Sequence, residues 1–171
     1  MLAQLLAASF LTILGVAGRL LPHPPNFTPV EAVALFSGAW MRNPWLRFLI
    51  PITIMGITDV ILGWHDLWPF TWGGVALGTW MGSRWLQPTK WLSVIGLSWL
   101  QATLFFLITN FGVWVMGWYG YSLQGLFACY LAAIPFYHYQ LIGAFAYGSV
   151  FWILEYFIIS RLAPQALSTL S

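Results

Sequence analysis

Few residues of this chain carry groups that could recognise a solute, and Asp59 is the most informative of them. It lies inside an apolar run, and an acid within a membrane segment is costly enough to indicate a functional site by default. The structural alternative is a buried pair with Arg19, which we expect at a similar depth on the first apolar run. His65 and Asp66 follow, and they either join the same site or lie in a solvated loop.

A second group of candidates lies in a proline-rich segment. Residues 22–29 carry four prolines, and proline lacks the amide hydrogen needed to continue a helix, so this stretch is extended and stiff. His23 and Asn26 are therefore either ligand-binding residues or hydrogen-bond partners of the loop backbone. Thr28, Pro29 and Glu31 then fit a capping box, which makes a helix cap the first interpretation of Glu31.

The helix that follows this segment ends before Asn43-Pro44 and has about 14 residues, or roughly 21 Å. The hydrocarbon core of a bilayer is about 30 Å thick, so the proline-rich segment must dip into the membrane to meet it. Irregular backbone is tolerated at that depth only where it is buried in protein or lines a cavity. The sequence thus predicts a pocket on the outer side.

A third group of candidates lies in residues 110–138, which carry no charge and many aromatic residues. An aromatic pocket with a few amides and hydroxyls suits a small organic ligand, although an aromatic belt at the membrane interface explains some of these residues. Gln101 shares a helix face with Thr109, which forms either the pocket floor or a hydrogen-bonding seam between helices. His138 is alternatively a metal or pigment ligand. The candidates from this part are Gln101, Asn110, Trp114, Tyr137 and His138.

The composition identifies the environment of these residues. Of 171 residues, 60% are apolar and 6% are charged, and the mean hydropathy is +0.80. An average soluble domain is about 25% charged, so a cytosolic enzyme, a nucleic-acid-binding domain and a disordered chain are excluded. A single cysteine excludes a disulfide framework and a multi-cysteine metal site. We expect one domain, residues 1–171, of the all-α polytopic membrane class, surrounded by lipid.

The apolar runs predict about six transmembrane helices. A shorter stretch, 122–134, is interpreted as a re-entrant or interfacial helical segment on the outer side. Five basic residues then fall on one side and Arg19 on the other, so both termini are predicted to be cytoplasmic. A seventh crossing at 122–134 would move Arg161 outside. The six runs are 2–21, 29–42, 47–64, 70–86, 91–109 and 139–161.

Small residues at four-residue spacing indicate close helix packing. Gly74, Gly78 and Gly82 form such a row in the fourth run, most simply for contacts within the protein. Glu155, in the inner half of the last run, needs a cationic partner such as Arg42, Arg84 or Lys90. The chain lacks a phosphate-binding loop, a His-Glu-x-x-His pair and a Gly-x-Ser-x-Gly elbow. We therefore expect no enzyme activity, no cofactor and no bound metal.

Four stretches resemble a family of small bacterial membrane proteins: Arg19-Leu20-Leu21-Pro22-His23-Pro24-Pro25-Asn26-Phe27-Thr28-Pro29, Thr58-Asp59-Val60-Ile61-Leu62-Gly63, Asn110-Phe111-Gly112-Val113-Trp114 and Ala133-Ile134-Pro135-Phe136. That family is similar in architecture to the substrate-binding (S) components of energy-coupling-factor transporters. The resemblance implies a multi-pass protein of the bacterial inner membrane that binds a small solute, such as a vitamin, near the outer face.

The same resemblance implies partners and roles. A membrane scaffold subunit with two ATPases would supply energy, the small pair Ala3 and Ala7 would dock the first helix on that scaffold, and residues 22–28 would form a lid. The chain lacks the Met-His amino terminus of nickel and cobalt binders, which disfavours metal as the substrate. The alternative function is a structural or accessory subunit of a larger respiratory or photosynthetic membrane complex, which the tryptophan content and packing glycines fit equally well.

Overall fold

The computed structural model describes residues 2–168, and the side chains of residues 4–157. Within residues 2–168 the chain forms six α-helices and no strands, which confirms the all-helical prediction. The helices are α1 (Leu2–Leu20), α2 (Val30–Trp40), α3 (Pro44–Leu62), α4 (Trp68–Trp85), α5 (Trp91–Val115) and α6 (Leu123–Ser168).

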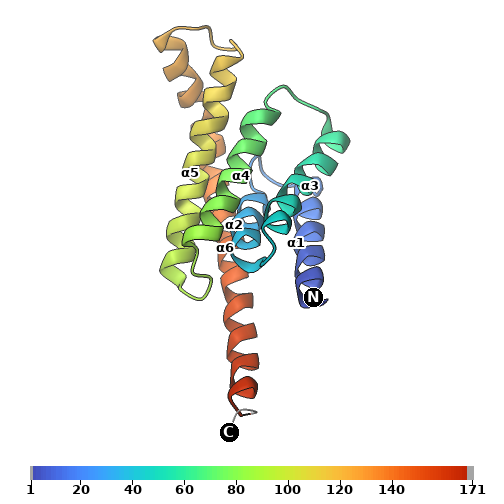
Figure 1. The fold of residues 1–171 in the computed structure, drawn as a ribbon. Coiled ribbons are helices and arrows are strands. Elements are labelled where there is room, and N and C mark those ends of the chain that lie inside the picture. Colours follow the sequence, from blue (N-terminus) through green and yellow to red (C-terminus); the bar gives the residue numbers. More distant parts are fainter. Residues whose placement is uncertain (1, 169–171) are drawn as a thin grey trace.

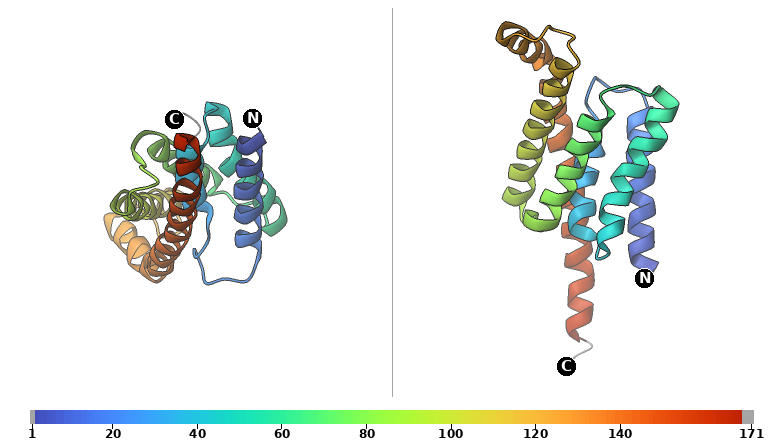
Figure 2. Two further views of the ribbon diagram at one scale, coloured as in Figure 1. Left: turned by 90° about the horizontal axis from the view of Figure 1, so that it is seen from below. Right: turned by 45° about the horizontal axis from the view of Figure 1, so that its top comes forward.

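Successive helices run in opposite directions, so the two ends of the described chain lie at the same end of the bundle (Figure 1). α1 packs on α2 and α3, whereas α5 packs on α4 and α6. Viewed along the bundle, α1 and α5 lie on opposite sides (Figure 2). The α5–α6 hairpin extends beyond the other helices at one end, and α6 extends beyond them at the other (Figures 1 and 2).

The shortest helix forms the centre of the bundle. α2 has 11 residues, about 16 Å of helix, and it contacts all five other helices. Every residue from Val30 to Gly38 is buried. A helix that is apolar on all sides is a core helix, which is the position that this one occupies.

Glycines bring α2 and α4 into backbone contact. A Cβ atom on Gly38 would collide with the Thr79 carbonyl oxygen, and one on Gly82 would collide with the Leu35 carbonyl oxygen. On the same helix α4, Gly78 leaves room for the Gln101 side chain of α5, whose Cδ lies 2.6 Å from the ideal Cβ position. The predicted role of the glycine row in helix packing is confirmed.

A proline within α3 is compensated from α2. Pro51 lacks the amide hydrogen that would bond to the Arg47 carbonyl oxygen one turn earlier. The Ser37 hydroxyl of α2 lies 3.0 Å from that oxygen and donates to it. A hydroxyl from a neighbouring helix thereby satisfies the group that proline leaves free, as an apolar environment requires.

The prediction for residues 110–138 is wrong in one respect. The segment 122–134 is not a separate re-entrant or interfacial element, because residues 123–134 form the first part of the 46-residue helix α6. α5 likewise continues to Val115, so the connection shrinks to residues 116–122. The polar residues that suggested a loop satisfy themselves within the helix, as Asn110 does by donating to the Phe106 carbonyl oxygen at 2.8 Å.

Among the residues that the structure describes, two helices, Pro44–Leu62 and Trp91–Val115, are long and apolar enough to cross a bilayer. Large apolar side chains are widely exposed on the outside of the described bundle, including Trp45, Leu92 and Val60. Both observations indicate an association with a membrane, since a soluble monomer rarely exposes extended apolar surface.

Candidate functional site

A cavity of about 650 Å³ lies where the proline-rich segment meets the bundle. All six helices contribute to its wall, together with residues of the connection before α2 and Leu67 of the connection before α4. Its apolar lining residues come from all six helices and from both connections. The polar lining residues are Arg19, His23, Asn26, Thr28, Glu31, Thr71, Thr109 and Asn110.

A backbone hydrogen bond folds the proline-rich segment into a turn, and the packing of Phe27 holds the segment against the bundle. Phe27 donates its amide to the Pro24 carbonyl oxygen at 3.0 Å, and Asn26 adopts a positive φ of 62° in this turn. The Phe27 ring packs on Tyr147 of α6, with centroids 5.5 Å apart. The segment therefore forms a fixed wall of the cavity.

Glu31 does not cap its helix, which corrects the first interpretation of this residue. Pro29 occupies the N-cap position of α2, and no side chain caps the helix there. The Glu31 carboxylate instead extends into the bundle, where Oε1 accepts a hydrogen bond of 2.6 Å from Gln140 Nε2 of α6. Glu31 is 9% exposed, lines the cavity, and its Oε2 has no hydrogen-bond partner.

Gln140 is itself fixed, which sets the orientation of the Glu31 carboxylate. Its Nε2 also donates to the Ala102 carbonyl oxygen of α5 at 3.1 Å, and the residue is fully enclosed at 2% exposure. The amide thus bridges α2, α5 and α6. A buried carboxylate with one anchored oxygen presents the other one in a defined position.

Asp59 is buried in a network of donors. Oδ1 lies 2.7 Å from Arg19 Nη1, as an ion pair without an aligned hydrogen bond. Oδ2 accepts from Trp72 Nε1 at 2.8 Å and lies 3.5 Å from His65 Nε2. Arg19 also donates to the Thr58 hydroxyl. The pair with Arg19, the structural alternative for Asp59, is present.

The structure brings three of the predicted binding residues to the cavity. His23 and Asn26 of the proline-rich segment line it, as does Asn110 of α5. Asp59 does not line it, although its ion-pair partner Arg19 does.

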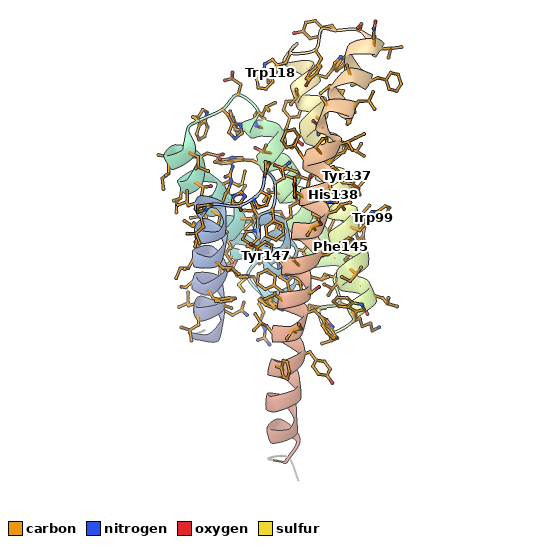
Figure 3. All side chains as sticks on the ribbon, turned by 180° about the vertical axis from the view of Figure 1, so that it is seen from behind. Trp99, Trp118, Tyr137, His138, Phe145 and Tyr147 are labelled. Atoms are coloured by element: carbon orange, nitrogen blue, oxygen red, sulfur yellow. The ribbon has the colours of Figure 1, made fainter. Side chains whose placement is uncertain are left out.

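The other four predicted binding residues lie elsewhere. Gln101 is buried in the seam between α4 and α5, where it donates to the Gly74 carbonyl oxygen at 3.0 Å. Trp114 donates to the Ser122 carbonyl oxygen near the end of the hairpin. Tyr137 is hydrogen-bonded to Thr103, and His138 is exposed beside it on α6 (Figure 3).

The residues assigned to the inner side also have defined surroundings. Ala7 packs partly against the core, and the side chain of Ala3 falls outside the described residues. Glu155 forms no ion pair with Arg42, Arg84 or Lys90 within the described side chains, so that prediction is wrong. It lies instead on a second, mainly apolar cavity that it shares with Trp40 and with α1.

The cavity offers little to a metal ion. Among the described residues, no group of three or more His, Cys, Asp or Glu side chains is placed to hold one. Glu31 is the only carboxylate on the cavity wall, beside the ionisable Arg19 and His23. Such a wall can instead hold an organic solute by hydrogen bonds at one end and apolar contacts at the other.

Sequence reasoning missed the pair formed by Glu31 and Gln140. The capping-box pattern around Glu31 offered a sufficient local explanation, which hid its long-range role. The two residues are 109 positions apart, and only the packing of α2 against α6 brings them together. A usable signal existed in Gln140, an isolated strong polar group within an apolar helix.

The sequence matches a family of unknown function, DUF6580, over residues 1–166. No curated protein and no solved structure matches the chain.

Proposed function

The chain belongs to the DUF6580 family, and we propose that it is a membrane-embedded, substrate-binding subunit of a transporter. It binds a small solute in the cavity beside the proline-rich segment. Partner ATPases, coupled through a membrane scaffold subunit, supply the energy in the manner of energy-coupling-factor systems.

The observation that carries this proposal is the cavity itself. Its volume of about 650 Å³ falls within the range of small-molecule sites. Residues from all six helices converge on it, and one of them, Glu31, has a buried carboxylate oxygen without a partner among the described residues. Burying such a group is costly, and a ligand that bonds to it repays that cost.

The proposal includes a topology in which all six helices cross or enter the inner membrane and both termini are cytoplasmic. Arg42 and Arg47 flank the turn between α2 and α3, and Arg84 and Lys90 flank the turn between α4 and α5. Both turns lie at the same end of the bundle as the termini, in agreement with the positive-inside rule. The cavity then opens on the outer side.

The exposed apolar side of α1 offers a surface on which a scaffold subunit could bind. Leu6, Phe10 and Ile13 are exposed on this helix, which packs on two neighbours only. Ala7 faces the core of this chain, so the apolar residues of α1 are better placed than the Ala3 and Ala7 pair to meet a partner. The energy source must be external, because the chain lacks a nucleotide-binding loop.

The test is a ligand screen joined to a purification. The protein, tagged at its carboxyl terminus, is solubilised gently, and co-purifying proteins are identified by mass spectrometry. The purified protein is then titrated calorimetrically with a panel of water-soluble vitamins, nucleosides, amino acids and polyamines. Recovery of a scaffold with ATPases, together with saturable binding of a panel member, supports the proposal. Absence of both contradicts it.

One observation favours the alternative of an accessory subunit in a larger membrane complex. The hairpin of α5 and α6 extends beyond the other helices, and its end exposes Trp118, Tyr121 and Phe127 (Figures 1 and 3). Such a surface fits a large apolar partner. Co-purification with a redox or pigment complex, without binding of any solute, would select this function.

A further inference from the structure

Glu31 Oε2 has no hydrogen-bond partner among the described residues, and this indicates which chemical group a bound solute would carry. We propose, building on the function proposed above, that the solute carries a basic nitrogen that donates a hydrogen bond to Glu31 Oε2. Its class is a small organic amine with an apolar or aromatic body. Glu31 is 9% exposed and lines the cavity, and its other carboxylate oxygen, Oε1, already accepts a hydrogen bond from Gln140.

The charges around the cavity favour a cation over an anion. Arg19 lies on the cavity wall, but Asp59 compensates its charge at 2.7 Å. His23 is placed between two backbone carbonyl oxygens, at 2.7 Å from that of Pro24 and 3.3 Å from that of Arg19. Among the described residues, Glu31 is thus the one acidic group on this wall, and in its ionised form it would attract a cationic solute and repel an anionic one.

The hydrogen-bonding capacity of Glu31 leads to the same class. In its ionised form the Glu31 carboxylate only accepts hydrogen bonds, so a solute that binds this form must offer a donor. A charged nitrogen donor forms a stronger bond with it than a neutral hydroxyl does. A bare metal ion would require several oxygen ligands, and the cavity wall supplies one carboxylate.

The remainder of the cavity indicates the body of the solute. Val75, Phe105 and Phe136 supply apolar wall, while Asn26 and Asn110 supply amides at its edge. An amine with an aromatic or aliphatic body fills both parts. A polyamine, which carries further charged nitrogens along its chain, would place some of them against the apolar wall without a partner.

Two matched series of probes test the inference in the intact, purified protein. The first comprises pyridoxamine, pyridoxine and 4-pyridoxate, and the second comprises 2-phenylethylamine, 2-phenylethanol and phenylacetate. Within each series the ring stays constant while the functional group changes from amine to alcohol to carboxylate. We expect the amine to bind about tenfold more tightly than the alcohol, and the carboxylate to bind least, in calorimetric titrations.

A pair of variants assigns the effect to Glu31. Glu31→Gln keeps the size of the side chain and removes its charge, and we expect it to abolish the preference for the amine. Glu155→Gln is the matched control, because it makes the same change at the second cavity. Thermal unfolding of the empty protein adds a readout independent of any ligand: Glu31→Gln should unfold at the same temperature as the wild type or higher, since it removes a buried ionisable group that has no counter-charge among the described residues.

The outcomes separate this inference from the function on which it rests. A preference for amines that is lost in Glu31→Gln and kept in Glu155→Gln supports it. Binding of the alcohol or carboxylate at least as tightly as the amine overturns the inference and leaves the proposed function standing. The same conclusion follows if Glu31→Gln keeps the preference, or if other panel solutes bind and neither amine does. Absence of binding across both series and the whole panel overturns the inference together with the proposed function.

Discussion

Two carboxylates are buried on the same side of this molecule, and they differ in how their oxygens are satisfied. Asp59 faces Arg19, Trp72 and His65, so donors surround both of its oxygens. Glu31 lines the cavity and has one donor, Gln140, while its other oxygen is buried without a partner among the described residues. Asp59 has a counter-charge, and removal of one member of a buried ion pair destabilises a fold, whereas the half-partnered Glu31 carries a cost that a ligand can relieve.

The largest effect is expected at Asp59. Asp59→Leu leaves the Arg19 guanidinium without its counter-charge, and we expect a loss of about 3 kcal/mol in the free energy of unfolding. Unfolding in detergent micelles, followed by circular dichroism, measures it. The double variant Arg19→Met/Asp59→Leu should recover most of the loss, because both charges are then gone. A stable Asp59→Leu protein that fails to bind solutes would make Asp59 a binding residue and reverse the comparison.

The next effect is expected at the anchor of Glu31. Gln140→Leu removes the only donor to Oε1 and leaves both oxygens of a buried carboxylate without partners, which should cost about 2 kcal/mol. The same unfolding measurement applies. The double variant Glu31→Leu/Gln140→Leu serves as its control, since an apolar pair requires no hydrogen bonds and should recover stability. If Gln140→Leu is as stable as the wild type, the contact between Gln140 and Glu31 contributes nothing to the fold.

A smaller effect is expected at Trp72, which donates to Asp59. Trp72→Phe keeps an aromatic ring near Trp64 and Trp68 and removes the indole N–H, so we expect a loss of about 1 kcal/mol. Solute binding, measured by calorimetry, should stay unchanged because Trp72 does not line the cavity. Loss of binding at unchanged stability would connect the Asp59 network with the site.

The smallest effect is expected at His65. Its Nε2 lies 3.5 Å from Asp59 Oδ2 and the side chain is 34% exposed, so solvent weakens the interaction. His65→Gln should change the free energy of unfolding by less than about 0.5 kcal/mol. A loss as large as that of Trp72→Phe would show that the two rings are equal partners of this acid.

The sequence was sufficient to predict the positions of the helices, because long apolar runs ended at prolines, glycines and charges. It was misleading over residues 110–138, where Asn110, Gly112 and Pro135 indicated a loop. These residues are tolerated within α5 and α6 because Asn110 bonds to its own helix and Gly112 makes room for the Phe70 ring of α4. Local breaking propensity was outweighed by packing between helices.

The candidate site could be predicted in its location but only partly in its residues. The reasoning that α2 is too short, and that the proline-rich segment must meet it, pointed to the end of the bundle where the cavity lies. His23 and Asn26 followed from that reasoning. The positions of Glu31, Gln101 and Gln140 depend on which helices are neighbours, and a single sequence does not contain that information.

The short central helix has a consequence for how the protein is made. At 11 residues, α2 is only about half the length that the insertion machinery recognises as a span, so it cannot enter the bilayer alone. Its neighbours include helices that are synthesised long after it, such as α6. In the proposed topology, α2 therefore stays at the membrane surface or in the translocation channel until the later helices have been synthesised. Biogenesis of this protein then depends on the synthesis of α6, and a chain truncated before α6 should be degraded instead of accumulating with α1–α5 alone.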